Sequence, residues 1–243
     1  MRMWTFSGRV AKEILRDPIN LALGLGFPLV LLFLLSAIQS NIPVSLFEID
    51  RLAPGISVFG LSFLTLFSAT LVSKDRESAF LQRLYTTPMR AAEFVLGYLI
   101  PLIPIALAQT AVCYLAAIPL GLTVSVRVVY AVFAILPMAV FHISLGLLCG
   151  SVLGSKQVGG ICGALLTNFS AWMSGVWFDL DLVGGLFRKL ANCLPFESAV
   201  RLSQTVHCGE NSPVFPQLFP VVLYAFLVSA AAVFCFLRQM KNR

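Results

Sequence analysis

Six long runs of apolar residues, separated by short polar segments, dominate the hydropathy pattern of the chain. Each run is long enough to cross a bilayer as a helix, because about 20 residues at about 1.5 Å of rise each cover roughly 30 Å of hydrocarbon. The runs are apolar on every face, whereas strands of a membrane barrel alternate polar with apolar residues. We therefore predict an all-α integral membrane protein with six spans at about 18–38, 53–73, 94–120, 128–154, 157–178 and 216–237.

The composition fits one transmembrane domain over residues 1–243. Hydrophobic residues make up 58% of the chain and charged residues 12%. The mean hydropathy of +0.90 lies well above that of soluble domains. The third and fourth spans contain prolines, which predict kinks or tilt there, at positions 101, 104, 119 and 137.

Lys and Arg are distributed unevenly between the two sides of the membrane. With a cytoplasmic N-terminus, twelve of them lie inside and five outside, which is the bias typical of membrane proteins. This predicts a multi-pass protein of the cell (plasma) membrane with both termini and residues 74–90 in the cytoplasm. The net charge of +6 is then explained by cations facing anionic lipid, and no nucleic-acid partner is expected. A cleaved signal peptide is disfavoured, because its apolar core is shorter than the first run.

Two of the six cysteines, Cys193 and Cys208, fall in the long outer segment before the last span. A disulfide between them is chemically allowed in an oxidising compartment, and the sequence leaves that bridge open. The other cysteines lie in spans, where they behave as small apolar residues.

The predicted spans contain no Lys, Arg, Asp or Glu in their middle. Carriers driven by ion gradients usually keep such groups at membrane depth, so this pattern argues against a proton- or sodium-coupled carrier. A few polar side chains remain, and we expect them to form hydrogen bonds between helices first and to contact cargo second. They are Gln109, His142, Asn168 and Ser170.

Glycines recur at four-residue spacing in the fourth and fifth spans. Small residues on one face let two helix backbones approach closely in lipid, so we predict helix packing here. The spacing leaves open whether the partner helix lies in the same subunit or in a second copy. The residues are Gly146, Gly150, Gly154, Gly159 and Gly163.

Motifs of enzymes are missing from the chain. The sequence has no phosphate-binding GxxxxGK[ST] loop, no HExxH and no GxSxG. Asp179 and Asp181 form a D-x-D at an outer helix end, where acids more often simply face water. We therefore expect no enzymatic activity and no metal site in this chain.

Charge gathers in the cytoplasmic stretch 74–90. Phe80, Leu81 and Leu84, with Tyr85 adjoining, fall on one side of a short amphipathic helix over about 75–86, with Lys74, Arg76, Glu77 and Arg83 as its polar surface. The following Thr87-Pro88 ends this helix and can begin the next. Spacing alone leaves open whether the helix lies on lipid headgroups or in the groove of a partner protein.

The run KDRESAFLQRLYTTP, Lys74 to Pro88, resembles the signature between the second and third spans in membrane subunits of ATP-binding-cassette (ABC) exporters of the type-2 permease superfamily. That pattern, R-E-x-x-x-L-x-R-L-x-T-T-P, is matched by Arg76, Glu77, Leu81, Arg83, Leu84, Thr86, Thr87 and Pro88. Residues 2–17 are similar to the N-terminal interfacial helix of the family, with Ile14 among its apolar residues and Arg9, Lys12 and Arg16 as its cations. CLPFESAV looks like the family's Leu-Pro turn between short outer helices, here over about 180–213, although Arg201 and Gln204 depart from the family's Asp and Arg.

The resemblance implies a permease that works as a dimer with a separate ATPase subunit. ATP and Mg would be bound by that partner, with no cofactor in this chain. Phe80, Leu81, Leu84 and Tyr85 would form the docking face for the ATPase, and Glu77 and Arg83 would position it through charge pairs. Thr87 and Pro88 would fix the angle to the third span. The alternatives are a stand-alone channel or secondary carrier for a small amphipathic solute and, third, a lipid-modifying enzyme.

Overall fold

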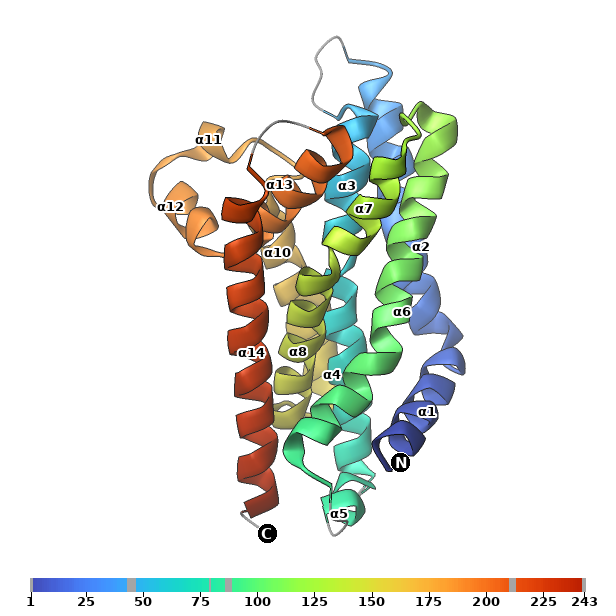
Figure 1. Cartoon of the computed structure of the whole chain (residues 1–243), viewed down its shortest axis with the longest axis vertical. Coiled ribbons are helices and arrows are strands. Elements are labelled where there is room, and N and C mark those ends of the chain that lie inside the picture. The colour runs from blue at the N-terminus through green and yellow to red at the C-terminus, as the bar shows by residue number, and fades with distance from the viewer. Residues whose placement is uncertain (1, 43–46, 79, 86–88, 210–212, 242–243) are drawn as a thin grey trace.

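Helices make up nearly all of the protein in a computed structural model that describes residues 2–42, 47–78, 80–85, 89–209 and 213–241. The helices are α1 (Arg2–Leu15), α2 (Pro18–Gln39), α3 (Ile49–Gly60), α4 (Ser62–Glu77), α5 (Phe80–Tyr85), α6 (Ala91–Ala117), η1 (Ile118–Leu120), α7 (Val126–Ala134), α8 (Leu136–Val152), α9 (Ser155–Val158), η2 (Gly159–Leu166), α10 (Thr167–Ser174), α11 (Leu180–Val183), α12 (Gly185–Cys193), α13 (Pro195–Cys208) and α14 (Phe215–Lys241). Figure 1 shows the long helices running side by side along the longest axis.

Within the described residues, five helical segments are long and apolar enough to cross a membrane. They are Pro18–Gln39, Ile49–Glu77, Ala91–Leu120, Val126–Val152 and Phe215–Lys241. The remaining expected span, 157–178, falls on the consecutive helices α9, η2 and α10, of which η2 is a π-helix. The all-helical membrane fold is therefore confirmed, and the count of six spans stays a prediction.

Two of the five segments are interrupted. One is split at Leu61, between α3 and α4, and the other at Ile135, between α7 and α8. Pro137 lies in the first turn of α8, where a missing N–H costs no helical hydrogen bond, so a new helix begins there. Pro101 and Pro104, by contrast, lie inside α6, which runs unbroken from Ala91 to Ala117.

The segment containing α4 is the central one. Its apolar window is 83% buried, against 17% for α2 and 17% for α14. Gly146 and Gly150 of α8 let the two backbones approach, since a Cβ on Gly150 would lie 2.5 Å from the carbonyl oxygen of Ala69 in α4. The partner of these two glycines is thus within the same chain.

The other glycines of the predicted packing set differ among themselves. Gly163 faces Leu66 of α4, whereas a Cβ on Gly159 would meet nothing within 4 Å. Gly154 follows the end of α8 and caps α9, so the chain turns there. Gly154 and Gly159 therefore do not pack against a helix of the same chain as Gly146 and Gly150 do, and a packing role for them toward a second copy stays a prediction.

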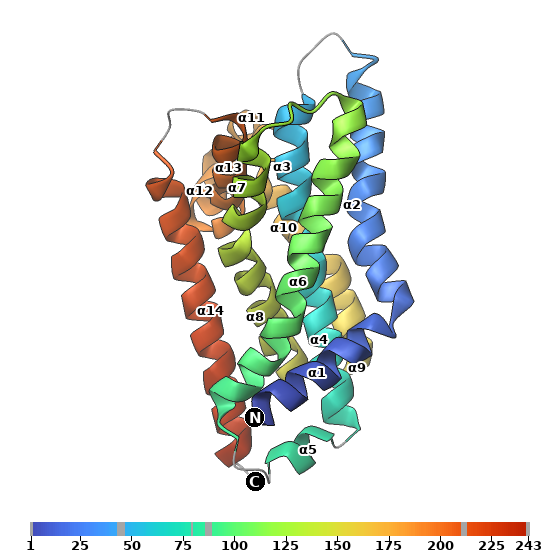
Figure 2. The ribbon, with the colours of Figure 1, turned by 45° about the vertical axis from the view of Figure 1, so that its right-hand side comes forward.

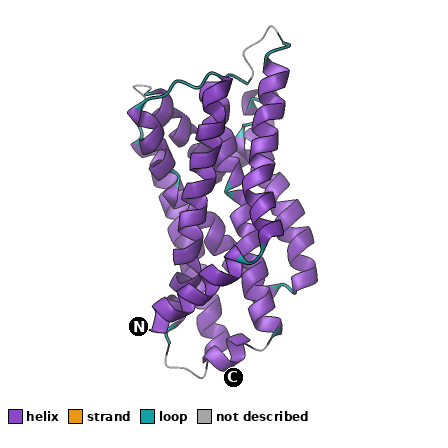
Figure 3. Cartoon of the chain, turned by 90° about the vertical axis from the view of Figure 1, so that its right-hand side faces the viewer, coloured by secondary structure: helices purple, strands orange, loops and turns teal. Residues whose placement is uncertain are grey.

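Both chain ends and α5 lie at one end of the bundle, and α11, α12 and α13 lie at the other (Figures 1 and 2). We call these the α5 end and the α13 end. A view at right angles to the first shows the two chain ends near the same, lower end of the bundle (Figure 3).

Cys193 and Cys208 are both free at the α13 end. Cys193 closes α12 and Cys208 closes α13, so nearly the whole of α13 separates them. At about 1.5 Å of rise per residue this is about 20 Å, beyond the roughly 7 Å that a disulfide can bridge. The bridge that the sequence allowed is therefore excluded in this fold by the straight helix between the two thiols.

The close approach of α4 and α8 yields a stability prediction. Gly150→Leu would overpack the contact with Ala69 and lower the free energy of unfolding by about 1–3 kcal/mol. Thermal unfolding of the detergent-solubilised chain measures this. The matched control is Gly26→Leu in α2, where an added Cβ has open space around it. Equal melting temperatures for the two variants would contradict the packing described.

Candidate functional site

A buried carboxylate lies at the α5 end of the bundle. Asp75, near the end of α4, is 2% exposed. The Arg9 guanidinium of α1 reaches both carboxylate oxygens, with Nη2 2.6 Å from Oδ1 and Nη1 3.0 Å from Oδ2. The Tyr98 hydroxyl of α6 donates to Oδ2 over 2.7 Å. A single side chain therefore joins three helices, and the bidentate Arg contact fixes their relative orientation.

Aromatic packing adds α5 to this arrangement. The Arg9 guanidinium carbon lies 3.7 Å from the centre of the Phe80 ring, which is cation–π geometry. Phe6 of α1 contacts the rings of Phe80, Phe94 and Tyr98, the last at 4.9 Å between ring centres. Gly97 of α6 leaves the room for the Phe6 ring. We call Arg9, Asp75, Phe80 and Tyr98 the Asp75 cluster.

The predicted helix over about 75–86 is corrected. Helix α4 continues through the charged residues to Glu77, Ser78 caps it, and only Phe80–Tyr85 form a separate helix. The charges do not end the span because they have partners on other helices, as Asp75 does. Thr87 and Pro88 lie outside the described residues, as does the side chain of Tyr85.

Arg76 and Glu77, the first two matches to the signature, hold the turn between α8 and α9. Arg76 donates to the carbonyl oxygens of Ser151 and Leu153 at the end of α8, where unsatisfied carbonyls favour a cation. A Glu77 oxygen accepts the Ser155 N–H at the start of α9 over 2.8 Å. Glu77 thus caps a helix of its own chain through one carboxylate oxygen, and its expected charge pair with a docked partner stays a prediction.

The apolar side of α5 packs against its own chain. Leu81 is 1% exposed, and Phe80 and Leu84 lie partly buried against the same core. Of the expected docking face, Leu81 is thus covered by this subunit and Phe80 and Leu84 are covered in part, so the docking role of Phe80 and Leu84 stays a prediction. The side chain of Arg83 is exposed.

Helix α1 is two-faced as expected, with one exception. Phe6, Val10 and Ile14 are buried, and Lys12 and Arg16 are exposed. Arg9 was expected among the outward cations, whereas it turns inward to Asp75 and also pairs with Glu13 at 3.0 Å.

The pKa values of two acids in this region, Glu13 and Asp17, are shifted in opposite directions. Burial, assisted by the nearby Asp75 carboxylate, raises the pKa of Glu13. Partial burial works to raise the pKa of Asp17 as well, but hydrogen bonds from Asn20 and the charge of Lys74 outweigh it and lower the pKa. Asp17 thereby stays a good cap for the start of α2.

The polar residues of the spans lie away from the Asp75 cluster. The Thr65 hydroxyl of α4 pairs with His142 Nδ1 of α8 at 3.0 Å, and Gln109 Nε2 of α6 donates to the Ser57 carbonyl of α3 over 3.3 Å. Asn168 donates to Ala164 of its own helical segment and is exposed, while Ser170 is buried in α10. His142 and Gln109 therefore form bonds between helices, and Asn168 does not.

No group of three or more His, Cys, Asp and Glu residues within the described ranges is arranged to hold a metal ion. At the α5 end, the Asp75 cluster connects α1 to the membrane-crossing helices α4 and α6 and to the short helix α5.

A helical bundle with five apolar crossings and a charged cluster at one end defines a multi-pass membrane protein. The family described as ABC-2 type transporter matches residues 1–206, which is most of the chain. The chain therefore belongs to the ABC-2 type transporter family and is a transmembrane permease subunit of an ABC transporter. Such permeases are normally non-catalytic, and ATP is bound by a separate partner subunit. A comparison with curated proteins finds no match.

Asp75 was not among the residues singled out from the sequence. It lies within the signature stretch, but its partners are 66 and 23 residues away. Only the fold brings Arg9 and Tyr98 to it.

Removing the charge of Asp75 tests the cluster. Asp75→Asn leaves Arg9 without its buried counter-charge and weakens the attachment of α1 by about 1–3 kcal/mol. Hydrogen exchange of the α1 amides would then become faster, while exchange in α14 stays as in the wild type.

The control for this experiment is Lys74→Gln, which removes the more exposed Lys74–Asp17 pair, 3.6 Å apart. Such pairs contribute little, so α1 exchange is expected to stay near that of the wild type. Unchanged protection of α1 in Asp75→Asn would show that the cluster does not hold the helix.

Proposed function

We propose that this permease subunit forms the translocation pathway of an ABC exporter as a dimer in the cell membrane, with both termini cytoplasmic. A separate ATPase subunit, which holds ATP and Mg, drives it by docking at the α5 end. The observation that carries this proposal is the Asp75 cluster, through which α1 and α5 are attached to α4 and α6.

The topology of this proposal needs six crossings, and α9, η2 and α10 supply the sixth. Ser155–Ser174 is helical throughout, and its 20 residues match the roughly 30 Å of a bilayer core. Both chain ends lie at the α5 end (Figure 1). Because α1 stays at that end, an even number of crossings is needed to return the chain there, which supports six spans over five.

The docking surface proposed here is the outward side of α1 and α5. Trp4 and Lys12 of α1, Arg16 directly after it and Arg83 of α5 are exposed. An acidic groove on the ATPase would complement these cations and fix the register of docking. This surface adds charged contacts to those expected of Phe80 and Leu84 and keeps Arg83 in the role that the signature gave it.

Contacts of the Asp75 cluster would transmit a movement of α1 or α5 to the helices that cross the membrane. A displacement of α1 acts on Asp75 through Arg9, and a displacement of α5 acts on Arg9 through Phe80. Asp75 belongs to α4, the most deeply buried of the crossing segments, which packs along α8 at Gly146 and Gly150. Closure of two ATPase subunits would therefore move α4 and α6 together in each permease copy.

Reconstitution with the cognate ATPase subunit tests the proposal. Arg83→Glu should weaken binding of the ATPase at least about tenfold, because it puts a like charge against an acidic groove. Native mass spectrometry of the wild-type complex should give two permease and two ATPase subunits.

The matched control is Arg238→Glu at the end of α14, an exposed arginine at the same end of the bundle. It should bind the ATPase within about twofold of the wild type. Equal loss of binding in both variants would indicate a general charge effect, and no loss in either would contradict docking at α5.

A further inference from the structure

Helix α12 at the α13 end has two faces of opposite character. On one face Phe187 packs against the core and Ala191 is fully buried. On the other face Leu186 and Leu190 are 73% and 50% exposed. Residues four apart lie on the same side of a helix, so these two leucines form one apolar stripe. The described part of the chain leaves this stripe largely uncovered.

The short helix α11, directly before α12, adds two more exposed apolar side chains. Leu182 and Val183 are 82% and 54% exposed. The turn to α12 runs through Gly184 and Gly185, whose positive φ angles favour glycine. Large apolar side chains gathered in this way on a surface mark a contact with another molecule or with lipid.

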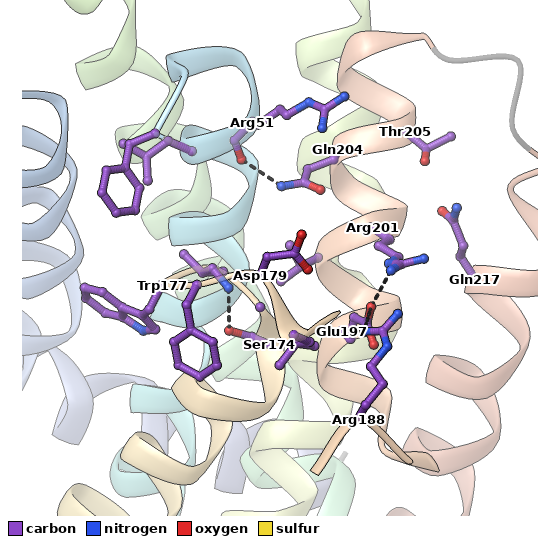
Figure 4. Close-up of a pocket in the computed structure, with 17 residues that line it drawn as sticks. Arg51, Ser174, Trp177, Asp179, Arg188, Glu197, Arg201, Gln204, Thr205 and Gln217 are labelled. Atoms are coloured by element: carbon purple, nitrogen blue, oxygen red, sulfur yellow. Dashed lines mark hydrogen bonds and ion pairs between the residues drawn. The ribbon is translucent and has the colours of Figure 1, made fainter. Parts of the chain in front are cut away.

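The two cations of α12 differ in their surroundings. Arg188 turns inward and donates to Glu197 of α13 over 2.7 Å, on one wall of a cavity of about 490 Å³ (Figure 4). It also pairs with Asp181 at 3.0 Å. Lys189, by contrast, is exposed and lies directly before Leu190 of the stripe. A lysine in this position can extend its ammonium to lipid head groups while its carbon chain covers apolar surface.

The last residue of α12 is bonded to a membrane-crossing helix. Tyr224 of α14 donates its hydroxyl to the carbonyl oxygen of Cys193 over 2.8 Å. Arg238, in the last turn of α14, marks the membrane border at the α5 end, and Tyr224 lies 14 residues before it. At about 1.5 Å per residue this is about 21 Å into a hydrocarbon layer of roughly 30 Å. Because side chains lean toward the start of their helix, the Tyr224 hydroxyl lies near the far edge of that layer.

The surface of α14 indicates what covers the stripe. The apolar window of α14 is only 17% buried, so most of this helix presents apolar side chains to the bilayer. Figure 1 shows α12 beside the first turns of α14. The stripe therefore adjoins a surface that lipid already covers. A short helix with one apolar face and a flanking cation at this depth has the arrangement of an interfacial helix.

We propose that α12 is an interfacial helix at the α13 end and that lipid is the partner of its apolar stripe. Leu186 and Leu190 insert among the acyl chains, and Lys189 lies at the level of the phosphates. Through Arg188 and Glu197 this contact also holds α13 and the cavity wall at the border of the bilayer. Because the contact lies within one copy of the chain, it does not depend on dimerisation or on ATPase docking.

Spin labels on the full-length chain in phosphatidylcholine nanodiscs test this contact, one label at a time in a background without native cysteines. Molecular oxygen collects among acyl chains, whereas a water-soluble nickel chelate stays outside them, so the ratio of collisions with the two reagents reports the surroundings of a label. The ratio at Leu186 and Leu190 should match that at Phe226, which is 69% exposed on α14. It should exceed severalfold the ratio at Asn41, which is exposed after the end of α2. All four side chains are exposed, so a label at any of them leaves the core intact.

The pattern of ratios along α12 decides between lipid, water and protein as the partner of the stripe. High oxygen-to-nickel ratios at Leu186 and Leu190, with an intermediate ratio at Lys189, would support the interfacial helix. Ratios equal to that at Asn41 would place the stripe in water and overturn the proposal. Few collisions with either reagent would place a protein surface on the stripe, such as a second copy of the chain, and would overturn it as well.

Discussion

The buried carboxylate of Asp75 is the constraint on which the α5 end depends. A carboxylate at 2% exposure is costly unless charged and hydrogen-bonding partners surround it. Here those partners come from α1 and α6, so satisfying one side chain fixes two helices against α4. The cation that pairs with Asp75 then stacks on Phe80 and fixes α5 as well. The exposed surfaces of α1 and α5 are thereby attached to crossing helices through side chains that cannot separate without leaving a buried charge unpaired.

The two ends of the bundle follow the same physical rule. In each, charged groups near the membrane surface are paired across helices, as Asp75 is with Arg9 and Glu197 is with Arg188. The difference lies in what remains accessible. At the α5 end the exposed cations lie on convex helices, which suits contact with another protein. At the α13 end the charged groups line a cavity of about 490 Å³ among α3, α12, α13, α14 and the segment between α10 and α11.

The sequence predicted five of the six expected spans where the structure has long apolar helices, because a run of apolar residues long enough to cross a bilayer has few other stable structures. It also placed Gly146 and Gly150 in a helix contact, since their spacing repeats on one helix face. It failed where a partner lies far along the chain. Asp75 and Glu77 were assigned to a separate short helix, whereas Arg9 and Ser155, 66 and 78 residues away, keep them in α4. The cavity at the α13 end was missed for the same reason. Its lining residues come from five segments that are far apart in the sequence, so no local sequence pattern predicts it.

The central claim is that α1 and α6 move as one unit at the α5 end. Spin labels at Gly8 of α1 and Leu96 of α6, both exposed, in a background without native cysteines, allow electron–electron distance measurements in the reconstituted complex. The account predicts that the Gly8–Leu96 distance within one copy stays constant when ATP hydrolysis is trapped, while the distance between Gly8 in the two copies changes. A change in the distance within one copy, with the distance between copies fixed, would contradict it.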